Sequence, residues 1–214
     1  MSSQEFEHSL DFTAIDDLDP STGDGLKIIY DREVPVEIRQ NVGGESGSVT
    51  PRGTLESIKC RLLALGGNGD YSMLRLELSS EADLFFHYAF NIDEHDFPEL
   101  QERQKLMIDF PHFSVVLIRM LNSCIADPHL NLAIFTEEGE NEARLDFIQN
   151  MEYKFVELLS CHCTKLPEEL IQRHITFRYN SVKQKLGLMQ GRLLEISNLV
   201  KLKNPSLLLQ LSKA

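Results

Sequence analysis

Four adjacent polar residues in the middle of the chain carry the groups used in acid–base chemistry. Asp93, Glu94, His95 and Asp96 offer three carboxylates and an imidazole, which can move protons or bind a cation. An amphipathic segment begins at the same place, and acidic side chains favour the start of a helix because they cap it and complement its dipole. We therefore interpret the cluster as a helix start, with Asp93 as the capping residue.

Glycines and cysteines offer two further kinds of site. The glycine-rich segment 66–70 is not followed by a helix that could present amides to a phosphate, so it predicts a tight turn. The cysteines lack the two close pairs of a structural zinc site. Two of them flank His162 in a predicted strand, so they share one face and His162 points to the other. We expect four buried, reduced thiols, at Cys60, Cys124, Cys161 and Cys163.

The sequence contains no motif that marks a known class of active site. G-x-G-x-x-G, a Walker phosphate loop, G-x-S-x-G and H-E-x-x-H are all absent. We therefore predict a non-enzymatic protein without cofactor or metal; a small enzyme whose site escapes motif searching is an alternative. There is no apolar run of about 18 residues and no basic start before an apolar stretch, which argues against a membrane span or secretory signal. We expect an intracellular protein.

Charge is distributed unevenly along the chain. The net charge is −12, yet residues 165–214 carry nine basic and three acidic groups. The acidic remainder argues against nucleic-acid binding there, whereas the basic segment suits an acidic surface, such as another head or a tubulin tail, or is simply a solvated face.

The clearest periodic pattern begins at residue 175 and ends at residue 200. Apolar residues recur every 3.5 residues through four heptads, which is typical of a helix that buries one seam against a second helix. We take one set as first heptad positions and the other as fourth positions, an assignment that favours two parallel strands. The first set is Ile175, Val182, Met189 and Ile196; the second is Tyr179, Leu186, Leu193 and Val200.

A helix that packs as a lid on its own domain is the alternative to a dimer. Leu188 and Leu194 widen the apolar stripe beyond a two-stranded seam, and Gly187 and Gly191 each weaken a helix by about 1 kcal/mol.

The rest of the chain divides into a head and two tails. Residues 1–26 are predicted to be a disordered acidic tail, in which Phe6, Leu10, Phe12 and Ile15 have the spacing of a short docking motif. Residues 27–165 form a β-rich head, 166–204 the stalk helix and 205–214 a C-terminal tail. Pro167 starts the helix and Pro205 stops it.

The head predicts an α+β, mainly β fold. Alternation and turn residues favour a β-sandwich or barrel of antiparallel strands with two helices inserted in mid-chain. Strands are expected at about 28–40, 58–64, 74–78, 86–92, 106–109, 130–136, 144–150 and 153–164, and helices at about 93–103 and 113–124.

The segment from Leu74 to Phe113 resembles the signature region of the spindle assembly abnormal protein 6 family, whose type member is the centriolar cartwheel protein. The matching features are paired phenylalanines and a tyrosine after a strand, an acidic helix start and a glutamine before a second aromatic group. They are Phe85, Phe86, Tyr88, Asp96, Phe97, Gln104, Ile108, Asp109, Phe110 and Phe113.

The resemblance implies a sandwich or barrel head with a helix–turn–helix insertion, followed by a parallel coiled coil. It also implies that heads pair through a hairpin whose bulky tip residue enters a pocket on the neighbour, so that linked dimers close into a ring. By its position relative to the last head strand, Tyr153 is the expected tip residue, with Phe155 as second choice. The alternative is that both are ordinary strand residues that face the core. The family usually has phenylalanine at the tip, and tyrosine must place its hydroxyl near water or an acceptor.

The resemblance finally implies partners and a location. The chain itself is the expected partner, as stalk dimer and head oligomer, together with other centriolar or microtubule-associated proteins, and without membrane or nucleic acid. The family continues into a long coiled coil, whereas this sequence stops soon after Val200. We therefore expect a short relative of the family, at a centriole, basal body, or flagellar or apical cytoskeletal structure; a fragment of a full-length member is the alternative. A DNA double-strand-break repair scaffold of the same head-plus-stalk architecture is the alternative, binding DNA or ligase along the stalk.

Overall fold

The computed structural model describes residues 12–40, 53–67 and 69–203, and it divides the chain into two compact units. One unit is Ser21–Ile171, and the other joins Met1–Pro20 with Gln172–Ala214. Within the described residues, no helix combines the length and apolar character needed to cross a membrane.

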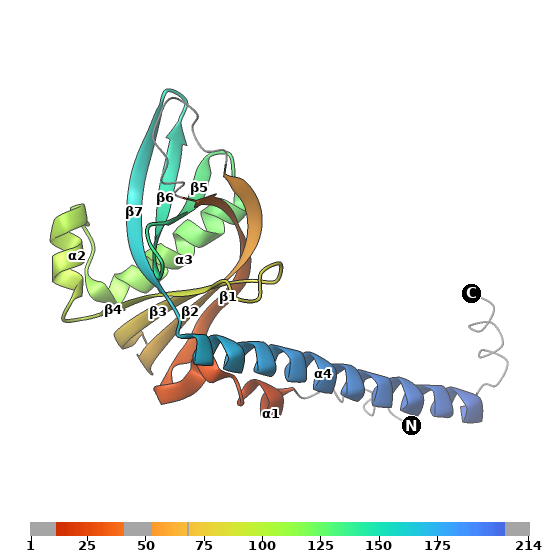
Figure 1. The fold of residues 1–214 in the computed structure, drawn as a ribbon. Coiled ribbons are helices and arrows are strands. Elements are labelled where there is room, and N and C mark those ends of the chain that lie inside the picture. The colour runs from red at the N-terminus through yellow and green to blue at the C-terminus, as the bar shows by residue number, and fades with distance from the viewer. Residues whose placement is uncertain (1–11, 41–52, 68, 204–214) are drawn as a thin grey trace. The chain divides into compact units, whose positions relative to one another are not determined.

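A closed seven-stranded barrel forms the first unit (Figure 1). Its strand order is β1-β2-β3-β4-β7-β6-β5, and the closing pair of β1 with β5 is parallel whereas the other pairs are antiparallel. The prediction of a mainly β head of mostly antiparallel strands is confirmed, and the one parallel pair among the described strands is the pair that closes the barrel. The strands are β1 Lys27–Gln40, β2 Thr54–Gly67, β3 Asp70–Ser80, β4 His87–Asp93, β5 Asn131–Glu137, β6 Glu142–Met151 and β7 Lys154–Lys165.

The tight turn predicted between the second and third strands is confirmed. β2 and β3 pair as a hairpin down to Gly67 and Asp70, and Gly66 and Gly69 have φ of +119° and +88°. A Cβ at Gly66 would lie 2.4 Å from the Asp70 carbonyl oxygen, so the close backbone approach requires glycine there.

Two helices, α2 (Phe97–Gln104) and α3 (Phe110–Ala126), stand between β4 and β5. The predicted capping role of Asp93 is wrong, because α2 starts four residues later, at Phe97. The Asp93 carboxylate instead accepts a hydrogen bond from the Asp96 amide, at 2.8 Å, before the helix begins. The strand predicted at 106–109 is also wrong. This segment links the two helices, and its alternation arises because Leu106 and Ile108 pack on the core while Met107 is 96% exposed.

The second unit contains the long helix α4 (Glu168–Lys203), whose first residues belong to the barrel unit, and the short helix α1 (Thr13–Asp16). The disordered-tail prediction is wrong for residues 13–16 and for the 3₁₀ segment Pro20–Gly25. The predicted helix stop at Pro205, the tail 205–214, and Phe6 and Leu10 lie outside the described residues.

Candidate functional site

The acid–base cluster lies at the surface beside the start of α2. The His95 imidazole is hydrogen-bonded to the Asp96 carboxylate, with 3.0 Å between Nδ1 and Oδ1, and this hydrogen bond raises the pKa of the imidazole. Ligand atoms of Asp93, His95 and Asp96 lie within 4.8 Å of one another, so the trio could hold a metal ion. All three side chains are exposed, and the hollow that Ser72 forms with Asp93, Glu94 and His95 is shallow and open to solvent. The cluster directly precedes α2, as interpreted, but Asp93 ends β4 and does not cap the helix.

All four cysteines are buried and free, as predicted. Burial raises the pKa of Cys124 to about 11 and that of Cys163 to about 12, and raises the pKa values of Cys60 and Cys161 as well. Because the thiolate is the reactive form, these thiols are inert. His162 is exposed, on the opposite face of β7 from its two neighbours.

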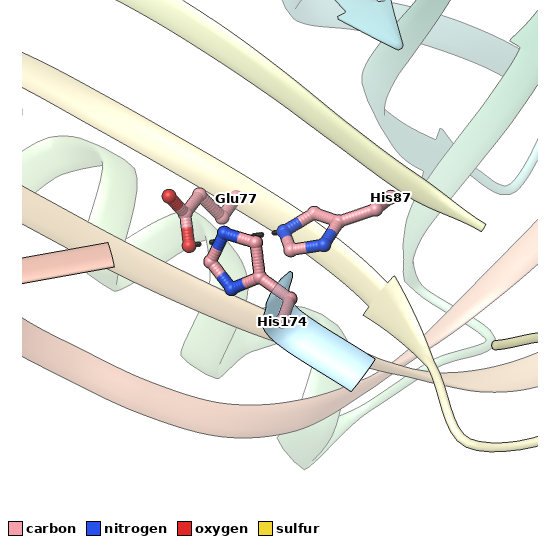
Figure 2. Close-up of side chains that lie close together, drawn as sticks. All are labelled: Glu77, His87 and His174. Atoms are coloured by element: carbon pink, nitrogen blue, oxygen red, sulfur yellow. Dashed lines mark ion pairs between the residues drawn. The ribbon is translucent and has the colours of Figure 1, made fainter. Parts of the chain in front are cut away.

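A buried polar network in the barrel unit was not foreseen from the sequence. Glu77 on β3 is 2% exposed, accepts the Ser21 hydroxyl at 2.6 Å, and lies 3.9 Å from His87 Nε2 (Figure 2). Arg61 donates to the Ser21 hydroxyl at 3.1 Å. Burial alone would raise the pKa of Glu77, but His87, Ser21 and Arg61 together lower it below its usual value. The third side chain in Figure 2, His174, belongs to α4.

The residues of the signature region hold the insertion on the barrel. Gln104 exchanges two hydrogen bonds with the backbone of Ser160 on β7, at 2.6 and 2.8 Å. Phe97 packs against Phe110 and Phe113, with ring centroids 5.5 and 5.1 Å apart. These side chains are therefore structural: they fix the positions of α2 and α3.

The β6–β7 hairpin displays the predicted tip residue in a two-residue turn. Glu152 and Tyr153 connect the strands, and the positive φ of Glu152 (27°) makes the reversal tight. Tyr153 is 89% exposed and Phe155, beside the turn, is 63% exposed. The alternative that both face the barrel core is therefore wrong. An aromatic pair left in water at a hairpin tip is typical of a contact surface.

A cavity of about 260 Å³ opens between α3 and the β5–β7 side of the barrel. Its wall is mainly apolar, with Ser123 and Asn131 among its polar groups. No local pattern in the sequence signals this cavity, since its walls come from four separate elements. It is lined by Val116, Arg119, Met120, Ser123, Cys124, Asn131, Leu132, Phe147, Ile148 and Leu158.

The seam, meaning the eight apolar residues assigned above, lies on α4. Its outer members Ile175 and Val200 are half-buried, and the six between them are exposed, from 38% for Ile196 to 67% for Tyr179 and Val182. These residues fill no core within the described chain. An apolar stripe of this length needs a second surface to cover it.

The heptad labels given to the two sets must be exchanged. Tyr179 follows Ile175 by four residues and precedes Val182 by three, so the set that contains Tyr179 takes the a position and the set that contains Ile175 takes d. Leucine at a with isoleucine at d does not favour two strands over four. Composition therefore does not by itself favour a dimer, although the seam residues are unchanged.

Comparison with known proteins agrees with this architecture. Residues 28–163 match the family model described as "Centriolar protein SAS N-terminal domain". The "Spindle assembly abnormal protein 6 homolog" of Danio rerio is 26% identical over 128 residues, which are 56% of this chain and 20% of that protein. The chain thus matches about a fifth of that relative's length.

Solved structures share the fold at low sequence identity. An N-terminal fragment of Leishmania SAS-6 with part of its coiled coil has a TM-score of 0.69 at 16% identity, covering 88% of this chain and 98% of that one. A Drosophila melanogaster Sas-6 fragment, described as dimerised via the coiled-coil domain, has a TM-score of 0.70 at 18% identity, covering 86% and 87%. The matching family model, relative and solved structures are all of SAS-6 proteins, so the DNA-repair alternative is not favoured. Because the family model matches residues 28–163, which are more than half of the chain, the chain belongs to the SAS-6 N-terminal domain family.

Proposed function

We propose that this protein is a non-enzymatic scaffold of the centriole or a related microtubule structure, built by two separate self-contacts. One contact joins two copies through the seam of α4, and the other joins barrels through the β6–β7 hairpin. The observation that carries the proposal is that both surfaces leave large apolar side chains in water, Tyr153 at 89% and Leu193 at 65% exposure. Such surfaces are stabilised when a partner covers them.

The second contact has both of its surfaces in one chain. Tyr153 would enter the cavity beside α3 on a neighbouring barrel, where the apolar wall covers the ring. Ser123 and Asn131 on that wall offer the polar partner that a buried tyrosine hydroxyl requires. Two different contacts that alternate between copies generate a ring if the rotation closes and a helix if it does not. Weak links then gain strength through the effective concentration that the first contact sets.

Light-scattering mass against concentration tests the proposal. The wild type should pass from a small oligomer to larger species, and Tyr153→Glu with Phe155→Glu should stop at the small oligomer. Leu158→Glu, in the cavity wall, should stop at the same point because it blocks the acceptor. Lys154→Glu is the matched control on the same hairpin and should still assemble. A wild type that stays monomeric at high concentration would refute the scaffold.

A further inference from the structure

The two segments of the second unit contact each other beside the seam. The Asp16 carboxylate of α1 lies 2.7 Å from Lys185 Nζ on α4, and the same ammonium lies 5.5 Å from the centroid of the Phe12 ring. Ile15 and Ser181 in the same unit are each 8% exposed. We call residues 12–19 the clasp. In Figure 1 the labelled helix α1 runs alongside α4.

The clasp lies next to the seam and does not cover it. Lys185 directly precedes the a-position residue Leu186, so it occupies a g position at the edge of the seam. With the clasp docked, Leu186 is still 52% exposed and Val182 67%. A second helix can therefore reach the seam while the clasp stays in place.

Two identical α4 helices have an electrostatic problem that the clasp addresses. In a parallel pair, each g residue faces an e residue of the partner, and oppositely charged residues usually stand there. In this chain no e or g position holds an acidic residue. Arg178 faces Lys183 of the second helix on each edge of the pair. Lys185 adds a third positive charge near them, whereas its own e partner, Gln190, is neutral. The g positions are Arg178, Lys185, Arg192 and Leu199, and the e positions are Thr176, Lys183, Gln190 and Ser197.

The clasp supplies the missing negative charge. It carries Asp16, Asp17 and Asp19 and no basic residue, whereas residues 172–203 carry seven basic groups and one acidic group. We propose that the clasp is a built-in counter-charge for the α4 pair: it docks on the g edge of its own helix and allows two like-charged helices to associate. This inference rests on the proposed α4 contact, and it adds a function for the N-terminal segment.

The dissociation constant of the α4 pair, measured by sedimentation equilibrium on the full chain, tests this role. Asp16→Lys should raise the constant about fivefold at about 50 mM salt, and the effect should shrink near 0.5 M salt because the contact is solvent-exposed. Glu140→Lys, the same charge change in an exposed turn of the barrel, should shift it less than about twofold. In a Lys185→Gln background the effect of Asp16→Lys should also fall below about twofold, because the clasp has lost its partner.

A zero-length carbodiimide cross-link between Asp16 and Lys185 provides a readout that does not need association. In a mixture of isotopically light and heavy chains, the cross-linked peptides should be all light or all heavy, as a contact within one chain requires. Mixed-isotope peptides, or no such cross-link, would overturn the inference.

The outcomes separate the inference from the function on which it rests. If the wild type never associates, the scaffold proposal fails, and the cross-link still reports whether the clasp docks. If the wild type associates and Asp16→Lys behaves like Glu140→Lys, only the counter-charge role is refuted. If Asp16→Lys tightens the pair, the clasp competes with the second helix, and the inference is again wrong.

Discussion

The barrel and α4 treat their apolar side chains in opposite ways. In the barrel, Leu62 and Phe113 are fully buried, so one chain completes its own core. On α4, Tyr179 and Leu193 remain 67% and 65% exposed although they repeat as regularly as any core residues. Periodicity thus identifies which side chains are stabilised by burial, but it does not say whether the chain itself or a second copy buries them.

Charged residues in the seam of α4 should have the largest effect, and that effect should be on association alone. Leu186→Glu with Leu193→Glu should weaken association by at least about 100-fold, because two a positions would place charges in an apolar seam. The melting temperature of the barrel should stay unchanged, since neither residue belongs to its core. Sedimentation equilibrium measures the first and circular dichroism the second. Leu194→Glu, at an outer position of the same helix, is the control; equal weakening there would show that the seam is misassigned.

A cavity in the barrel core should have the second largest effect, and it should lower the stability of the barrel without changing α4. Phe113→Ala should lower the free energy of unfolding by about 3–5 kcal/mol, because the ring is fully buried against Phe97 and leaves a cavity. Urea denaturation gives this value, and association of the folded protein should be unaltered. Val115→Ala, 54% exposed on the same helix, should cost less than about 1 kcal/mol. Similar losses for the two variants would contradict the burial difference.

The third effect concerns the buried carboxylate of the barrel. Because the folded pKa of Glu77 is lowered, its ionised form stabilises the fold above about pH 4.3, the usual value for glutamate. That contribution is lost as the pH falls below about 4.3 through the folded pKa. Glu77→Gln should therefore destabilise the barrel by about 2–4 kcal/mol at about pH 7, and by less below about pH 4.

Thermal melts of Glu77→Gln against pH measure this dependence. The exposed Glu140→Gln variant serves as control and should follow the wild type at every pH. A Glu77→Gln penalty that stays constant down to about pH 3 would mean that the pKa of the Glu77 carboxyl is the same in the folded and the unfolded chain, which would contradict the lowered pKa.

Replacing one glycine by alanine in each region should have the smallest effects, and these should have opposite signs. Gly66→Ala should destabilise the barrel by about 1–3 kcal/mol, because the position combines positive φ with a backbone contact. Gly191→Ala should stabilise α4 by about 1 kcal/mol, because nothing lies within 4 Å of the added Cβ and alanine favours helix. Chemical denaturation followed by circular dichroism reads both. The same sign for both variants would contradict this assignment.

Local patterns in the sequence were sufficient for most of the helices and strands and for the apolar stripe on α4. Alternation and turn chemistry located the β2–β3 hairpin, and the 3.5-residue repeat located α4 and its seam, because both patterns are set by residues near one another in the chain. The tip position of Tyr153 was predicted through the family resemblance, from its place relative to the last head strand. The signature residues were found, but their structural role was visible only in their contacts.

Tertiary structure decided what depends on residues far apart in the chain. The parallel closure of β1 on β5, the cavity beside α3 and the network of Ser21, Arg61 and Glu77 each join distant segments. The segment 106–109 has the alternation of a strand, yet it links two helices because the packing of Leu106 and Ile108 overrides local preference. The contact of Asp16 with Lys185 spans 169 positions. Local preference determines which segments are helix or strand, whereas the pairing of remote surfaces is known only once the chain has folded.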